Sequence, residues 1–322
     1  MLNFPLITVV CVFFNRGSLV DRTVKSLLSQ SYPFYEVILV DDGSTDDTYD
    51  RLNVFASNEK VSVYHHENIG FTASIKKAIE HYSCGEYIAI QGAGDVALPD
   101  RLAEQAEYLS KNRGVVAVGG GRRIINERTG LGNIVFRPDL GRGQLIFKAN
   151  VFSHGEVMFR KSIYDLVGGY RLFFKYSQDV DLWLRMNSLG GLGHVKKILY
   201  EEYSLSDGVR NDFNKVLLQK KYNAIARYDV LNPGRLELIC ELLPDDVLRR
   251  IDRKKYISTI VKAAIRFMAD CRLDGYVLFV DELRLFSESR LYFLFLSSFK
   301  PKFLFKCGHY SLRSLLWVLN KS

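Results

Sequence analysis

The first 120 residues of the chain alternate apolar runs with stretches of helical periodicity. Five apolar, β-branched runs predict strands, at residues 7–13, 37–40, 61–64, 87–90 and 115–118. Three segments with apolar positions on one helical face predict helices, at residues 20–28, 72–82 and 99–111. Strands that alternate with helices favour an α/β fold with a mostly parallel central sheet and right-handed crossovers.

Polar or small residues follow three of the predicted strands. Asn15 comes after Phe13 and Phe14, Asp41 and Asp42 end the second strand, and residues 92–95 end the fourth. In open parallel sheets, ligands bind beyond the carboxyl ends of the strands. The three segments are therefore expected to converge on one crevice.

The segment Asp41-Asp42-Gly43-Ser44 carries the clearest chemical signal. A pair of carboxylates at a strand end can accept hydrogen bonds from a nucleobase N–H and from ribose hydroxyls. Gly43 and Ser44 favour a tight turn after the strand. By composition alone, a capped loop without a ligand is an equal alternative.

In order along the chain, these segments resemble glycosyltransferase family 2, the inverting enzymes of the GT-A fold. The resemblance spans residues 5–205 and rests on several ordered motifs: Asn15-Arg16, Gln30, 41–46, Asn68-Ile69-Gly70, Pro99 with Arg101, 154–160, 168–170 and 178–185. It implies transfer of a sugar from a nucleotide-diphosphate sugar to the hydroxyl of a saccharide or lipid-linked acceptor. The breadth of the family points to cell-surface polysaccharide synthesis, such as capsule, O-antigen or lipopolysaccharide.

The resemblance also assigns roles by position. Asp179 stands where the family has its general base, and a helix N-cap is the structural alternative. The acceptor side is assigned to His154, Gly155, Glu156 and Gln178. The donor side is assigned to Phe13, Asn15, Asp41, Asp42, Gly43, Ser44, Asn68, Gly70, Lys76, Gly92, Ala93, Gly94 and Asp95.

The chain departs from the family at residues 92–95. The family has an Asp-x-Asp-Asp motif there, which holds Mg²⁺ or Mn²⁺ against the diphosphate, whereas this chain has Gly92-Ala93-Gly94-Asp95. Asp95 is left as a lone candidate metal ligand. Alternatively, the cationic side chains of Lys76, Lys77 or Arg101 neutralise the diphosphate without a metal, or the chain is an inactive relative.

Two other motifs are given structural interpretations. The run Gly119-Gly120-Gly121-Arg122-Arg123 lacks the spacing and the Lys-Ser/Thr of a phosphate-binding loop, so a turn is expected there. His65 and His66 precede the Asn68 loop and are expected to be exposed.

From about residue 214 the spacing of apolar residues becomes helical, and the alternation with strands ends. We expect a GT-A domain over residues 1–210 and a helical C-terminal region over residues 211–322. Residues 290–322 carry six Lys or Arg side chains and eight aromatic ones without an acidic residue. This composition suits peripheral attachment to a membrane surface, with a helix packed on the catalytic domain as the alternative.

Bulk composition narrows the setting. The formal charge of +8 favours anionic partners, but no recognised nucleic-acid module accompanies it, so nucleic acid is not expected as a partner. Five scattered cysteines without a CxxC pair, and no signal peptide or long apolar stretch, predict a cytoplasmic protein at the inner face of the cytoplasmic membrane. A sugar nucleotidyltransferase or a non-catalytic nucleotide-sugar-binding relative are the competing functions.

Overall fold

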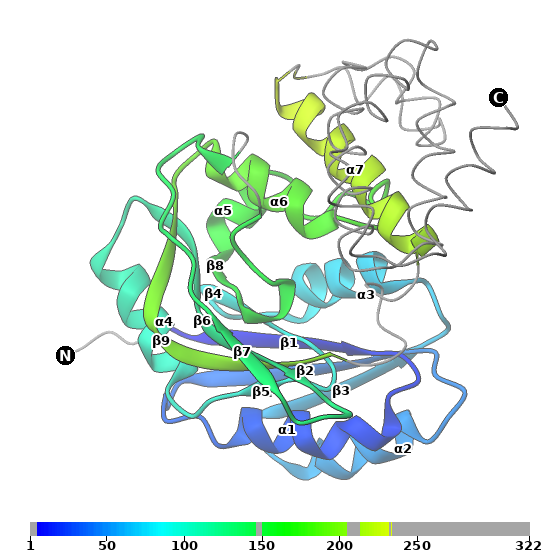
Figure 1. Ribbon diagram of the computed structural model, residues 1–322. Helices are drawn as coiled ribbons and strands as arrows, with labels where there is room; N and C mark the ends of the chain where they lie inside the picture. Colours follow the sequence, from blue (N-terminus) through cyan, green and yellow to red (C-terminus); the bar gives the residue numbers. More distant parts are fainter. Residues whose placement is uncertain (1–4, 146–149, 205–212, 232, 234–322) are drawn as a thin grey trace, which may run out of the picture. The chain divides into compact units, whose positions relative to one another are not determined.

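The computed structural model describes residues 5–145, 150–204, 213–231 and 233 (Figure 1). The chain divides between Ser206 and Asp207 into two units. In the second unit the described element is the helix α7, Phe213–Leu231. The basic-aromatic segment 290–322 lies outside the described residues. Over the part of the chain that is described, no helix combines the length and the apolar character needed to span a bilayer.

Four parallel strands in the order β3-β2-β1-β4 form the first half of the sheet. Their bounds are Ile7–Phe13 for β1, Tyr35–Asp42 for β2, Val61–His66 for β3 and Tyr87–Gln91 for β4. The helices are α1 (Val20–Leu28), α2 (Thr48–Asn53) and α3 (Phe71–Lys77), the last continuing as a π-helical turn to Tyr82. Figure 1 shows α1 and α2 on one face of these strands and α3 on the other. Right-handed crossovers require this arrangement, because the order reverses between β1 and β4.

The second half of the sheet continues from β4 in the order β8-β6-β9-β5, and β7 pairs with β6. These strands are β5 (Val96–Ala97), β6 (Val115–Asn126), β7 (Gly132–Val135), β8 (Met158–Arg160) and β9 (Gly191–Ser204). The helices of this half are α4 (Arg101–Lys111), α5 (Lys161–Leu166) and α6 (Gln178–Asn187). β8 is antiparallel to both β4 and β6, whereas β6 and β9 are parallel. The predicted α/β fold with a mostly parallel sheet is confirmed.

The core forms where β1 is buried on both faces. Every residue of β1 is buried, as its continuous apolar run predicts. Alternate residues Val9, Cys11 and Phe13 belong to the same core cluster as Val24 and Leu27 of α1. Burying each such side chain contributes about 1.5–3 kcal/mol. This packing fixes the carboxyl end of β1, which the loop of Asn15 follows.

The sequence predicts a turn at the glycine run 119–121, and this prediction is wrong. The run forms the middle of β6. A Cβ on Gly119 would approach the ring of Phe152 to 2.8 Å, and one on Gly120 would approach Leu199 to 2.8 Å. The glycines therefore allow close packing on both faces of a strand, a use that their turn-like composition conceals.

Candidate functional site

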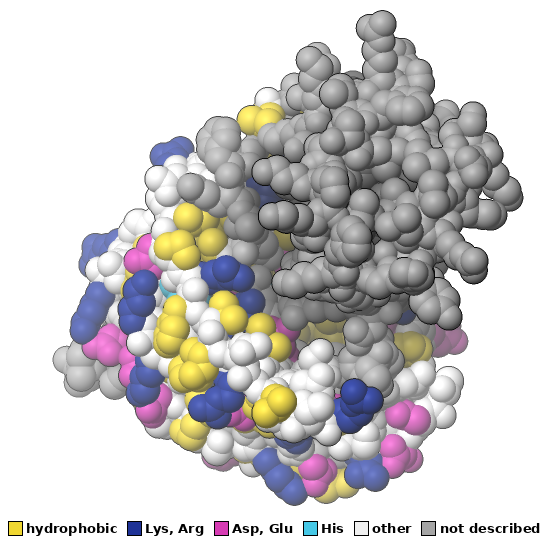
Figure 2. All heavy atoms as spheres, viewed as in Figure 1, with side chains coloured by type: hydrophobic (Ala, Val, Ile, Leu, Met, Phe, Trp, Pro, Cys, Tyr) yellow, Lys and Arg dark blue, Asp and Glu magenta, His cyan; other side chains and the backbone are white. Residues whose placement is uncertain are grey.

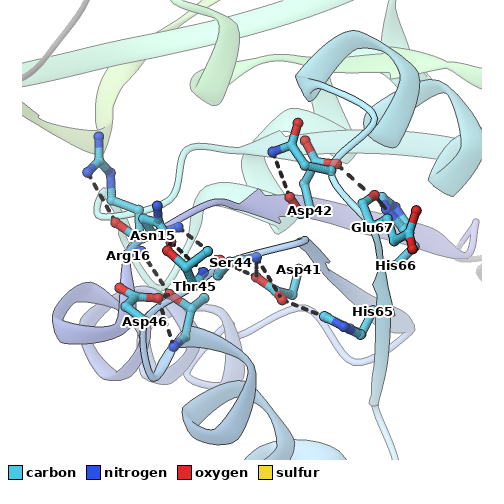
Figure 3. A network of polar contacts seen from close by, with 12 residues as sticks. Asn15, Arg16, Asp41, Asp42, Ser44, Thr45, Asp46, His65, His66 and Glu67 are labelled. Carbon is cyan, nitrogen blue, oxygen red and sulfur yellow. Dashed lines mark hydrogen bonds and ion pairs between the residues drawn. The ribbon is translucent and has the colours of Figure 1, made fainter.

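The polar segments at the carboxyl ends of β1, β2 and β3 are joined by hydrogen bonds (Figure 3). Asn15 follows β1 in the left-handed conformation, with φ 51°. Its backbone N–H donates to Ser44 Oγ at 2.8 Å, and its side-chain oxygen accepts from the backbone N–H of Thr45 at 2.8 Å. Asn15 thus locks the loop after β1 to the loop after β2, as expected of neighbouring strand ends.

Asp41 is fully buried, and its carboxylate is used inside the protein. It accepts hydrogen bonds from Ser44 Oγ and from the backbone N–H of Ser44, and His65 Nδ1 lies 2.7 Å from its Oδ2 (Figure 3). Asp41, which the sequence assigns to the donor side, therefore shapes the loop after β2 from within the protein.

Asp42 connects β2 to the loop after β3. Its Oδ1 accepts from the backbone N–H of Ile69 at 2.9 Å, and its carbonyl accepts from Asn68 Nδ2 at 2.8 Å. His66 Nδ1 stands 3.6 Å from Asp42 Oδ1, and this histidine is mostly buried, contrary to expectation. Gly43 is required beside it, since φ is +69° and a Cβ would overlap the backbone of Asn68.

Phe14 is the exposed aromatic residue at the carboxyl end of β1. Phe13, which the sequence predicted as a donor contact, is fully buried in the core cluster. Phe14 is 47% exposed directly after β1. Side chains alternate between faces along a strand, so only one of the two could reach the crevice. An exposed phenylalanine next to a predicted strand end is the signal that could have identified it.

Lys76 does not reach toward the diphosphate segment. It pairs with Glu80 one turn later on the same helical stretch, where Gly70 in a positive-φ conformation precedes α3. Gly70 therefore lies directly before α3. The pairing of Lys76 with Glu80 gives no support to the alternative in which Lys76 neutralises the diphosphate in place of a metal.

The segment Gly92-Ala93-Gly94-Asp95 leaves β4 and directs its one carboxyl into the protein. Asp95 Oδ2 accepts from Tyr200 Oη at 2.7 Å, and Oδ1 accepts from the backbone N–H of Tyr203 at 2.9 Å. Burial raises the pKa of Asp95 to about 7, against the opposing effect of these hydrogen bonds. The backbone N–H groups of Gly92 and Gly94 are also used, on Tyr200 Oη and Thr23 Oγ1.

These residues do not fit a metal held by carboxylates. Both oxygens of Asp95 already accept hydrogen bonds, and Gly92 and Gly94 contribute no ligand. Among the described residues, no group of three His, Cys, Asp or Glu side chains is arranged to hold a metal ion. No chemical step is therefore assigned to a metal here.

Asp179 lies in the first turn of α6. Asn150 Nδ2 donates to its Oδ2 at 3.1 Å, which orients the carboxylate. Ser177, two residues earlier, is left-handed with φ 54°, and it is the N-cap residue in place of Asp179. In the described chain, Asn15 and Ser177 are the non-glycine residues with positive φ, one on each side of the candidate site. Such strain is typical of functional sites.

An aromatic wall stands beside Asp179. His154 Nε2 lies 2.6 Å from Tyr170 Oη, and the imidazole also packs against Trp183 and Phe71. Burial lowers the pKa of His154, while the nearby Asp179 acts in the opposite direction. Phe71 begins α3 directly after Gly70, so these aromatic contacts reach from α3 to Trp183 of α6.

Glu156, which the sequence assigns to the acceptor side, is directed into the protein. Its side chain is buried, and Oε1 accepts from Arg122 Nη1 at 2.8 Å and from the backbone N–H of Ser153 at 2.9 Å. Burial raises the pKa of Glu156 to about 7, although the adjacent Arg122 lowers it. Gly155 packs against Tyr200, and a glycine is needed there because a Cβ would overlap the hydroxyl of Tyr200. Of the four predicted acceptor residues, His154 and Gln178 keep partly exposed positions.

Two arginines clamp α6. Asp181 is fully buried and accepts from the guanidinium groups of both Arg171 and Arg185. Arg185 also donates to the carbonyl oxygens of Val167 and Gly169, at 2.7 and 2.8 Å. The clamp holds the helix that carries Asp179 against the loop before it.

Comparison with known proteins places this geometry in a family. The model of glycosyl transferase family 2 matches residues 8–176, ending just before Asp179. A relative from Bacillus subtilis, described as putative glycosyltransferase EpsE, is 31% identical over 270 residues, which are 79% of this chain and 95% of that protein. A second from the same species, described as putative teichuronic acid biosynthesis glycosyltransferase TuaG, is 31% identical over 42% of this chain and 54% of its own.

Solved structures show the same fold at low identity. A crystal structure of S. aureus TarS 1-349 in complex with UDP-GlcNAc has a TM-score of 0.55 and 14% identity, over 88% of this chain and 93% of TarS 1-349. The mannosyltransferase PcManGT from Pyrobaculum calidifontis, in complex with GDP-Man and Mn²⁺, has a TM-score of 0.55 and 17% identity, over 87% of this chain and 80% of its own. These likenesses support the predicted GT-A architecture.

Proposed function

The chain belongs to glycosyl transferase family 2, and on that premise we propose that it transfers a sugar from a nucleotide-diphosphate sugar to an acceptor hydroxyl with inversion, using Asp179 as the base. The observation that carries the proposal is the carboxylate of Asp179, which Asn150 orients at 3.1 Å and which lies near the partly exposed His154. That the chain is a glycosyltransferase follows from the family itself.

The proposed reaction is a single displacement. Asp179 accepts the proton of the acceptor hydroxyl while the oxygen of that hydroxyl attacks the anomeric carbon of the donor sugar. The bond to the diphosphate breaks on the opposite side, so the configuration inverts. The hydrogen bond from Asn150 to Oδ2 holds the carboxylate of Asp179 in one orientation. Its remaining lone pairs can then accept the proton of the acceptor hydroxyl.

The experiment is sugar transfer by the full chain with a panel of UDP-, GDP- and dTDP-sugars and lipid-linked acceptors. We expect Asp179→Asn to lower kcat by about 10²–10⁴-fold with little change in donor affinity, because it removes the base but keeps the shape. Asp165→Asn, on the exposed surface of α5, is the matched control. Transfer that continues undiminished in Asp179→Asn would exclude this residue as the base.

The donor is proposed by class only. TarS has been crystallised with UDP and UDP-GlcNAc, and PcManGT with GDP-Man. The exposed Phe14 and the rigid loops at Ser44 and Asn68 support a nucleoside diphosphate here. A thermal-shift screen of nucleotides identifies the nucleobase of the donor. Binding without transfer to any acceptor would favour the non-catalytic alternative.

The setting is proposed to be polysaccharide synthesis at the inner face of the cytoplasmic membrane. The teichuronic acid assignment in the name of TuaG supports a cell-surface polymer. Peripheral attachment is supported by the basic-aromatic composition of residues 290–322. A second support is the β6–β7 hairpin, which exposes Leu131, Ile134 and Phe136 next to Arg128 and Arg137. Figure 2 shows apolar and basic side chains interspersed over the face that this hairpin occupies in Figure 1.

A further inference from the structure

The loop that replaces the family's metal motif is organised around a tyrosine. Tyr200 Oη, from β9, donates to Asp95 Oδ2 at 2.7 Å and accepts from the backbone N–H of Gly92 at 3.0 Å. Tyr203, on the same strand, donates its backbone N–H to Asp95 Oδ1 at 2.9 Å. The hydroxyl of Tyr200 therefore stands between Gly92 and Asp95, the first and last positions of the motif.

This arrangement leaves no room for the missing carboxylates. A Cβ on Gly92 would overlap Asp95 Oδ2 and lie 3.0 Å from Tyr200 Oη. Gly94 has φ +102°, and a Cβ there would point at Leu19 Cδ1, 2.8 Å away, toward α1. An aspartate at 92 would displace the carboxyl of Asp95 from its place, and an aspartate at 94 would need a different backbone because φ there is +102°. The glycines are thus part of a rebuilt loop rather than two isolated substitutions.

Positive charge is built in behind the same loop. The guanidinium of Arg101 lies 5.0 Å from the ring centre of Tyr200, and that of Arg22 lies 3.9 Å from the ring centre of Tyr203. Arg101 is fully buried and donates to neutral acceptors, including Gln91 Oε1 at 2.8 Å and the carbonyl of Ile90 at 2.7 Å. Fixed cations in a low-dielectric site can stabilise a developing negative charge without reorganisation.

We infer that this chain binds and releases the donor's diphosphate without a Mg²⁺ or Mn²⁺ held by its own carboxylates, and that Asp95 is a structural partner of Tyr200 and Tyr203. The inference rests on the proposed function, since it concerns the same donor site. Arg101 supplies the compensating positive potential at the end of β4, whereas the charge of Arg22 is already paired with Glu127 at 2.9 Å. The cluster of Asp95 with its two tyrosines holds the loop in the shape that the diphosphate meets.

The test is calorimetric titration of the full chain with UDP, GDP and dTDP, in EDTA and in Mn²⁺. For the nucleotide that binds, we expect Kd values in the two conditions to agree within about threefold. A gain in affinity of about tenfold or more in Mn²⁺ would overturn the inference and leave the proposed function intact. If no nucleotide binds in either condition, the donor site itself fails, and the inference fails with it.

A variant separates the two roles of Asp95. Asp95→Asn keeps the shape and can still accept from Tyr203, so we expect its Kd values in EDTA and in Mn²⁺ to agree within about threefold, as in the wild type, with a lower Tm. Asp100→Asn, an exposed aspartate after the same loop, is the control. If the wild type gains affinity in Mn²⁺ and Asp95→Asn abolishes that gain, Asp95 is a metal ligand and the inference is wrong. If the variant folds poorly, the wild-type titration in EDTA and in Mn²⁺ still tests the inference.

Discussion

At the residue scale, Phe14 and Phe34 form a natural matched pair, since they are 47% and 52% exposed. Phe14 follows β1 at the carboxyl edge of the sheet, whereas Phe34 precedes β2 at the opposite edge. Stacking of a nucleobase on an aromatic ring is worth about 1–3 kcal/mol. We therefore expect Phe14→Ala to weaken nucleotide binding by roughly tenfold or more and Phe34→Ala to leave it unchanged. Titration calorimetry measures both, and equal affinities in the two variants would exclude stacking on Phe14.

Glu156 makes the stability of the fold depend on pH. Its pKa of about 7 lies above the ordinary value of 4.5, so the folded chain holds this proton more tightly than the unfolded chain. The resulting stabilisation is complete below about pH 4.5 and is lost as the pH rises through about 7. Glu156→Gln stays neutral, so we expect its Tm to fall less than that of the wild type across this window.

Thermal unfolding as a function of pH measures this effect. Asp95, whose pKa is also raised to about 7, contributes a pH dependence of the same sign, so the variant retains part of the slope. Glu107→Gln, which removes an exposed partner of Lys111, should follow the wild-type curve. Parallel curves for Glu156→Gln and the wild type would show that Glu156 does not titrate in this range.

At the element scale, α6 depends on the buried carboxylate of Asp181. Asp181→Asn would leave Arg171 and Arg185 without their shared charge partner, and breaking a buried pair in this way costs about 3–5 kcal/mol. We expect a clear fall in Tm, together with a lower kcat because Asp179 lies in the same helix. Asp165→Asn disrupts an exposed pair on α5 and should cost under about 1 kcal/mol. Similar losses of Tm in the two variants would contradict the role of the clamp.

At the scale of the whole molecule, we propose that residues 1–210 carry donor binding and that residues 211–322 carry membrane attachment. A chain ending at residue 210 is expected to unfold cooperatively and to bind nucleotide like the full chain. It should sediment less with vesicles containing anionic lipid, and added salt should weaken binding of the full chain. Undiminished vesicle binding by the shorter chain would shift the attachment to the β6–β7 hairpin, where Leu131→Ser and Phe136→Ser test it.

The order of strands and helices in the first half follows from local pattern. Short continuous apolar runs of β-branched residues are typical of strands buried on both faces, and parallel strands bring their carboxyl ends to one edge. For that reason the sequence predicts that Asn15, Asp42 and residues 92–95 lie at one edge, and the structure joins the loop of Asn15 by hydrogen bonds to the loop that follows Asp42. The family resemblance was also readable from the sequence, because its motifs occur in a fixed order along the chain.

Side-chain direction and distant partners were decided by the tertiary structure. Which of Phe13 and Phe14 faces the crevice depends on how β1 sits against α1, and the burial of Asp41 and Glu156 depends on neighbours far along the chain. The same holds for the metal motif. Its missing aspartates were visible in the sequence, but the hydroxyl of Tyr200 that fills their place comes from β9, and only the curled sheet brings it beside Asp95.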